Sequence, residues 1–148
     1  MRLRLSVLSL SAAVLMMVIT GLVGAPTASA VTTREGKLLD RVNSARTAHG
    51  LRPLRLSAEL SSYARQHSRQ MSAQRALFHT SNFGVICCWS AIAENVGVAY
   101  SVRGLHQALM GSAPHRANIL DPRMRAVGVG VVESGGQLWA TQIFRKPS

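Results

Sequence analysis

The sequence predicts an α+β domain in which helices pack on a small antiparallel sheet. Three segments between residues 32 and 110 space their apolar residues at helical intervals. An apolar run precedes the third of them, and the chain ends with two strand-like segments around Gly135-Gly136. Helices grouped ahead of a terminal hairpin are typical of α+β domains, because α/β folds alternate helices with parallel strands.

The first predicted helix begins at Thr32 or Thr33, either of which can cap it, and runs to about Ala48. Gly50 follows at the position where helices often end in the left-handed conformation. The apolar residues of this segment share one face of the helix: Leu38, Leu39, Val42 and Ala45.

The second predicted helix is capped by Ser57, with Glu59 in the first turn, where a negative charge suits the helix dipole. Residues that repeat every three or four positions form its inward stripe: Leu60, Tyr63, Ala64 and Met71. His67 lies on the same stripe, and we interpret it as a histidine packed in the core or at its edge.

The stretch from Leu77 to Tyr100 is predicted to be irregular, apart from one strand around Ile92–Val98. Ser101 starts a third helix, over about Val102 to Met110. We expect its inner face to consist of Leu105, Ala108 and Leu109.

A short turn through Leu120 leads into the closing hairpin. Valines alternate with glycines over residues 127–132, Gly135-Gly136 makes the turn, and residues 138–144 return. We expect Trp139 on the returning strand to be part of the core.

Residues 1–30 have the three parts of a cleavable signal peptide. Arg2 and Arg4 precede an apolar stretch, and Ala28-Ser29-Ala30 offers small residues for cleavage. The alternative is an uncleaved membrane anchor, since the apolar stretch is nearly long enough to span a bilayer. Cleavage leaves Val31–Ser148, a secreted chain of one domain with no second membrane-spanning stretch, which we expect to be a monomer.

The mature chain is strongly basic. Without Arg2 and Arg4 it holds 15 Lys and Arg against 6 Asp and Glu, a formal charge of +9. Such a charge attracts anionic surfaces, and an envelope or lipid component fits a secreted protein. The alternative is that the charge only maintains solubility, because the arginines are scattered rather than clustered. We expect no specific nucleic-acid partner.

The two cysteines, Cys87 and Cys88, are adjacent. Export permits a disulfide between them, but two buried thiols or an intermolecular link remain alternatives. We interpret them as structural, because zinc ribbons need spaced pairs. Trp89 follows, and we expect it to pack in the core rather than flank a site.

Three polar residues stand where the patterning does not require them: His79, Glu94 and His115. Glu94 interrupts an apolar run, and a carboxylate there is costly unless it is paired or ligated. Two imidazoles and a carboxylate could hold a divalent cation, with water at the open positions. The spacing alone is weak evidence for a metal site, and it favours instead two histidines that are satisfied in the core or at the surface.

A set of short segments also matches, in order, the motifs of a known family. These are Leu39–Arg46 with Gly50–Leu54, Ser57–Leu60 with Tyr63-Ala64, Phe78–Thr80, Ala93–Val96, Ser112–Leu120, Gly128–Gly130 and Trp139–Phe144. The chain resembles the CAP superfamily of cysteine-rich secretory proteins, venom antigen 5 and plant pathogenesis-related proteins, especially its compact bacterial, SCP-like branch. Ala93 stands where the family's Gly-Glu-Asn motif has glycine, and the run from His115 to Leu120 is the more specific match.

The resemblance implies a three-layer α-β-α sandwich with a central cleft. It places His79, Glu94 and His115 in that cleft, with the two histidines able to hold a divalent cation. Gln107 stands where bacterial relatives often have a second acid, and an amide is a poor metal ligand and no general base. Metal binding should therefore be weak, with zinc favoured by imidazole ligands.

Three hypotheses for the function follow. The first is an extracellular module that binds a ligand or partner in the cleft. The second is metal-assisted hydrolysis, in which His79 and His115 hold the cation and Glu94, the candidate catalytic residue, takes a proton from bound water. In the third, the same residues only satisfy one another's hydrogen bonds.

Overall fold

The structure, a computed structural model, describes residues 32–148. Within this range the chain forms four helices and four strands. In chain order they are α1 (Thr33–Ala48), β1 (Arg55–Leu56), α2 (Ala58–Gln74), β2 (Trp89–Ala99), α3 (Val102–Gly111), α4 (Ala113–Ile119), β3 (Ala126–Ser134) and β4 (Gln137–Pro147). The predicted signal peptide, residues 1–30, lies outside the described residues. No helix within 32–148 has the length and apolar character needed to cross a bilayer.

The four strands form one sheet in the order β1-β3-β4-β2. Strands β3 and β4 form the predicted antiparallel hairpin around Gly135 and Gly136, and β2 pairs antiparallel with β4. The sheet is antiparallel as expected except at β1, which pairs parallel with the start of β3. This two-residue strand follows Leu54, whose buried side chain anchors the loop against the core.

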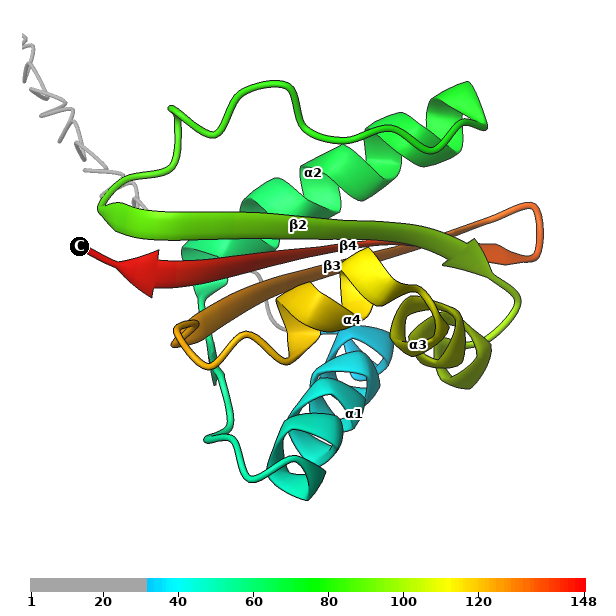
Figure 1. Cartoon of the computed structure of the whole chain (residues 1–148). Coiled ribbons are helices and arrows are strands. Elements are labelled where there is room, and N and C mark those ends of the chain that lie inside the picture. The colour runs from blue at the N-terminus through cyan, green and yellow to red at the C-terminus, as the bar shows by residue number, and fades with distance from the viewer. Residues whose placement is uncertain (1–31) are drawn as a thin grey trace, which may run out of the picture.

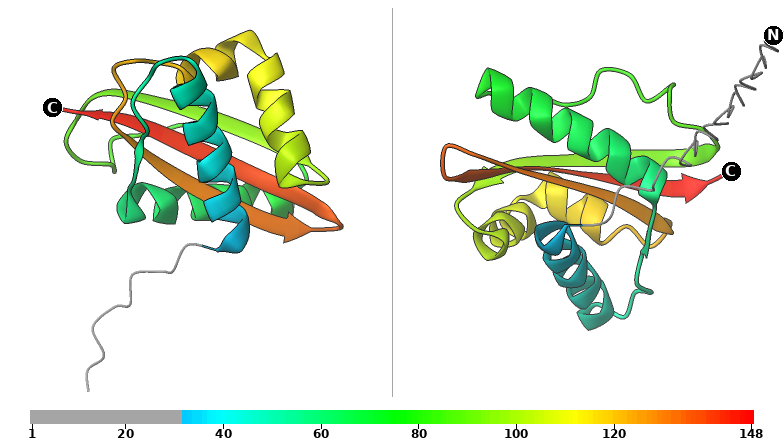
Figure 2. Two further views of the ribbon diagram at one scale, coloured as in Figure 1. Left: turned by 90° about the horizontal axis from the view of Figure 1, so that it is seen from below. Right: turned by 180° about the vertical axis from the view of Figure 1, so that it is seen from behind.

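The sheet is the middle layer of an α-β-α sandwich, as predicted. Helix α2 covers one face, while α1, α3 and α4 cover the other (Figures 1 and 2). Helix α2 approaches β3 so closely that a Cβ at Gly128 would lie 2.2 Å from the carbonyl carbon of Leu60. A Cβ at Gly130 would lie 2.3 Å from the backbone of Ala64. The glycines that alternate with valines in β3 therefore form the surface on which α2 rests.

The predicted caps are confirmed. Thr32 and Glu35 form a reciprocal capping box at the start of α1, and Ser57 and Ser101 accept bonds from the first turns of α2 and α3. Trp139 is buried, as expected.

Three local predictions are wrong. Residues 113–119, expected to form a turn, form helix α4, with Pro114 in its first turn. Ala108 is exposed, because α3 buries only Leu105 and Leu109 against the rest of the domain. Trp89 is 38% exposed, since it begins the edge strand β2.

A buried ion pair connects the start of α1 to α2, and its carboxylate also bonds β3. The Glu35 carboxylate accepts bonds from the Arg65 guanidinium at 2.7 and 2.9 Å and from the Val131 backbone at 3.3 Å. The hydrogen bonds from Arg65 to the Glu35 carboxylate, together with its charge, raise the pKa of Arg65. Because β1 covers only the first residues of β3, this carboxylate also satisfies part of the open β3 edge.

Candidate functional site

Glu94 lies in the middle of β2 and is buried, with an exposed fraction of 7%. Its Oε1 atom accepts bonds from the Thr80 backbone N–H at 2.9 Å and from His79 Nδ1 at 2.8 Å. Its Oε2 atom accepts a hydrogen bond from the Thr80 hydroxyl at 2.6 Å. The carboxylate therefore fixes the segment that follows α2 against the edge strand, which offsets the cost of placing a charge in an apolar strand.

His67 joins this site from α2, although the sequence analysis assigned it only a packing role. Its Nε2 atom donates to the Phe78 carbonyl oxygen at 2.8 Å and lies 3.9 Å from Glu94 Oε2. The imidazole and the Phe78 ring meet edge to face, with their centroids 5.1 Å apart. The helical stripe correctly indicated that His67 is buried, but it contained no signal for the neighbouring carboxylate.

His79 and His115 approach the site from different layers. The His79 side chain is 60% exposed, and its bond to Glu94 through Nδ1 leaves Nε2 free to face a ligand. His115 lies at the third position of α4 and is half-buried. Burial, and then the charge of nearby His79, lower the pKa of His115, so the imidazole is neutral at pH 7.

A network of amide side chains holds α4 against β2. Asn95 Nδ2 donates to the His115 carbonyl oxygen and to Gln142 Oε1, both at 3.1 Å. Asn118 Nδ2 donates to Asn95 Oδ1 at 2.9 Å and to the Glu94 carbonyl oxygen at 3.3 Å. The position of His115 is therefore set by the amides of Asn95, Gln142 and Asn118, which the motif pattern alone did not place at the site.

The remaining predicted residues lie outside this network. Gln107 is an exposed residue of α3, and no hydrogen bond within residues 32–148 joins it to His79, Glu94 or His115. Cys87 and Cys88 are exposed and joined to each other by a disulfide. Within the same range no three His, Cys, Asp or Glu side chains are grouped so that they could hold a metal ion.

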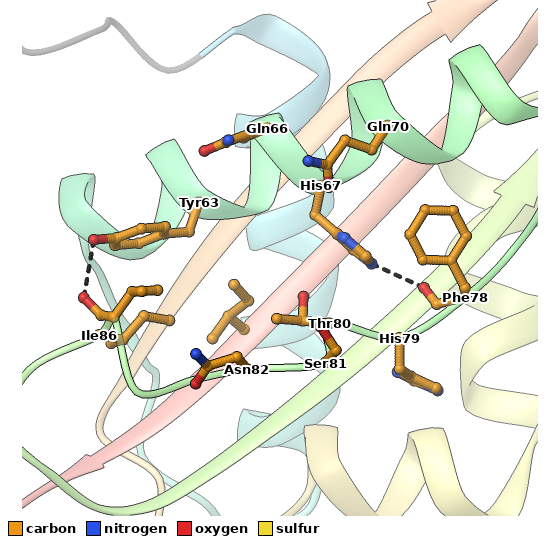
Figure 3. A pocket seen from close by; sticks show the side chains of 12 residues that line it. Tyr63, Gln66, His67, Gln70, Phe78, His79, Thr80, Ser81, Asn82 and Ile86 are labelled. Atoms are coloured by element: carbon orange, nitrogen blue, oxygen red, sulfur yellow. Dashed lines mark hydrogen bonds between the residues drawn. The ribbon is translucent and has the colours of Figure 1, made fainter.

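A pocket of about 300 Å³ lies between α2 and the segment after it, with His79 at its border (Figure 3). Gln66, His67 and Gln70 lie along the helix side, and Thr80 to Asn82 lie along the opposite side (Figure 3). The Tyr63 hydroxyl donates to the Val85 carbonyl oxygen at 3.0 Å and closes one end. A concave space thus adjoins the histidine–glutamate site and shares His67, His79 and Thr80 with it.

An α-β-α sandwich in which His79 bonds a buried glutamate fits the class of domain that the sequence motifs resemble, that of the CAP proteins. Residues 39–144 match the cysteine-rich secretory protein family, CAP. The chain belongs to this family, as the resemblance in its motifs predicted.

A bacterial relative matches most of the chain. The chain is 32% identical over 130 residues to the uncharacterized protein YkwD of Bacillus subtilis strain 168, a match that covers 80% of this chain and 49% of YkwD. This chain therefore spans about half the length of that relative.

Two solved structures show the same fold. An extracellular SCP-domain protein of Bacillus anthracis superposes with a TM-score of 0.68 at 22% identity, over 76% of this chain and 40% of that protein. An outer surface protein of Borrelia burgdorferi superposes with a TM-score of 0.72 at 14% identity, over 80% of this chain and 96% of that protein.

Proposed function

We propose that this domain is an extracellular ligand-binding module whose cleft is formed by His79, Glu94 and His115. The observation that supports this proposal is the saturation of Glu94. Its two oxygens accept three hydrogen bonds from His79 and Thr80, so the carboxylate serves to orient His79. A ligand then meets the free Nε2 of His79 and the neutral imidazole of His115.

The same arrangement suits a weakly held divalent cation. A carboxylate that accepts the Nδ1 proton of a histidine fixes the tautomer in which Nε2 can ligate a metal. The residues present supply two imidazoles and no third ligand of the usual kind within 32–148, which fits loose binding of zinc with water completing the coordination. Bound zinc would supply Lewis acidity at this position.

The hydrolase hypothesis is less well supported by this geometry. It requires Glu94 to accept a proton from water, while the carboxylate is already committed to three donors. Gln107, in the position of the family's second acid, cannot replace it as a base.

The surface charge favours an anionic partner, such as an envelope or lipid component. Four of the six carboxylates in residues 32–148 pair with arginines. Eleven of the fifteen lysines and arginines in this range therefore have no carboxylate partner, and most of these eleven side chains are exposed. The chain should therefore bind phosphatidylglycerol vesicles more tightly than phosphatidylcholine vesicles, with a difference that declines as salt is added.

The cleft is tested by zinc titration calorimetry on residues 31–148. We expect saturable binding that is lost in the His79→Ala/His115→Ala variant and retained in His49→Ala, an exposed histidine at the end of α1. Binding that persists in the double variant would contradict the assignment of the cation to this cleft. If the parent domain does not bind zinc, the assignment of a cation to this cleft is also contradicted, and uncharged ligands of the two imidazoles would be tested next.

A further inference from the structure

The pocket beside α2 has a chemical character unlike the rest of the surface. Among the side chains that line it there is no Asp, Glu, Lys or Arg, although the domain as a whole is strongly basic. Its histidine on the helix side, His67, donates through Nε2 to a backbone carbonyl. The lining therefore offers two histidines, His67 and His79, but no permanently charged side chain, and this favours an uncharged ligand.

The polar groups around the pocket are amides and hydroxyls with free bonding capacity. Within residues 32–148 the Gln66 and Gln70 carboxamides and the Ser81 hydroxyl make no hydrogen bond to protein. Asn82 uses only Oδ1, which accepts from the Gly84 N–H at 2.6 Å, so its Nδ2 is available. Gln66 and Gln70 lie on the α2 side of the pocket, and Ser81 and Asn82 lie on the side of the segment after α2 (Figure 3).

The interior of the pocket is apolar. Phe78 and the buried Ile86 and Ile143 line it, with Tyr63 at one end. At about 300 Å³ the pocket is at the small end of the range for ligand sites. Polar groups on both sides with an apolar interior suit a compact ring that carries hydroxyls, and they do not suit a lipid chain.

We propose that this pocket binds one unit of a neutral, amide-bearing saccharide, such as an N-acetylated hexosamine. The sugar hydroxyls and the acetamido group would pair with the free carboxamides of Gln66, Gln70 and Asn82, and the acetyl methyl would enter the apolar interior. The pocket adjoins the cleft of His79 and His115, with His79 at the border of both, but none of the groups that would pair with the sugar is a proposed metal ligand. The pocket also shares Thr80 with the cleft, because Thr80 lines the pocket and bonds Glu94.

The test uses N-acetylglucosamine as the probe, titrated into residues 31–148 and followed by chemical-shift changes. The variant Gln66→Ala/Gln70→Ala removes two exposed carboxamides from α2 without opposing helix formation. Gln74→Ala is the matched control, since Gln74 lies one turn further along the same helix and does not line the pocket. We expect affinity to fall about tenfold in the double variant, the effect of losing one or two neutral hydrogen bonds, and to be unchanged in the control.

Two further probes test the chemical class. Glucosamine has an ammonium in place of the amide and should bind more weakly, because the lining offers no carboxylate. N-acetylalanine amide has amides without a sugar ring, and binding equal to that of N-acetylglucosamine would overturn the saccharide assignment in favour of a peptide.

The proposal is also overturned by the absence of saturable binding, or by binding that the double variant leaves intact while its thermal midpoint is unchanged. His115→Ala separates the two sites, because His115 does not line the pocket. That variant should no longer bind zinc but should still bind the sugar. Failure of the cleft proposal and failure of the pocket proposal therefore give different results.

Discussion

Substitution of Glu94 separates an orienting carboxylate from a catalytic one. Glu94→Ala removes the acceptor for the Thr80 N–H, the Thr80 hydroxyl and His79 Nδ1. A hydrogen bond to a charged group contributes about 1.5–3 kcal/mol, and water can replace part of it at half-exposed Thr80 and exposed His79, so we expect a loss of about 3 kcal/mol in all. Glu94→Gln keeps an oxygen for both N–H donors and turns an NH₂ toward the Thr80 hydroxyl, which can rotate to accept. Its cost should be about 1 kcal/mol, the loss of charge assistance.

Urea unfolding of the two variants measures these values, with the slope of the transition checked for constancy. Zinc titration of Glu94→Gln supplies the functional comparison. An orienting carboxylate predicts that binding persists at reduced affinity, because an amide oxygen can still accept the Nδ1 proton of His79. An orienting role for Glu94 is refuted if Glu94→Gln destabilises the domain as much as Glu94→Ala. It is also refuted if Glu94→Ala costs less than about 0.5 kcal/mol, the lower end for a single hydrogen bond.

Three more predictions concern stability. Arg46 is fully buried and donates to three backbone carbonyls. Arg46→Met should therefore lower the free energy of unfolding in urea by about 3–5 kcal/mol. A loss below about 1 kcal/mol would show that the guanidinium is dispensable. Gly130→Ala should lower the free energy of unfolding by about 3 kcal/mol, since its Cβ would meet the α2 backbone at 2.3 Å. The control Gly111→Ala has open space around its Cβ and should be neutral or slightly stabilising. Burial lowers the pKa of His106 and His115, so the unfolded chain binds more protons below about pH 6.5. Stability is then complete above that pH and declines as the pH falls through it, and a His106→Gln/His115→Gln variant should have a flatter Tm profile between about pH 7.5 and 5.

The elements that local chemistry determines could be predicted from the sequence. Thr32, Ser57 and Ser101 cap helices because a side-chain oxygen satisfies a free N–H of the first turn, and this requires no knowledge of the tertiary structure. The hairpin follows in the same way from valine alternation and from Gly135-Gly136, both of which have positive φ.

The errors occurred where neighbours distant in sequence decide the outcome. Strand β1 is only two residues long and exists because Arg55 and Leu56 meet the start of β3, about seventy residues later. Trp89 has the composition of a core residue, but it begins an edge strand that has no partner on one side. Periodicity reports which face of an element is apolar, and it does not report which elements lie at the edge of a sheet.

The candidate site was predictable only in part for the same reason. His79, Glu94 and His115 were identified by their patterning and by the family resemblance, and the structure joins His79 to Glu94 directly. His67 was missed as a neighbour of Glu94, because a histidine on a buried stripe usually has only a packing role. The position of Gln107 in the cleft remains a prediction that came from the resemblance alone.

The order of residues in β2 explains how one strand supports both histidines. Consecutive residues of a strand point to opposite faces of a sheet. Ile92 and Val96 pack with residues of α2, so Glu94 between them faces the same layer and holds His79, while Asn95 faces the opposite layer and bonds the backbone of His115.

β2 is an edge strand, and the charge of His79 on one side of it contributes to lowering the pKa of His115 on the other. A ligand that bridges both imidazoles would therefore connect the segment following α2 to α4 across the sheet edge. Such binding favours the folded state alone, so the thermal stability of the domain should rise with ligand concentration, in proportion to the logarithm of its excess over the dissociation constant.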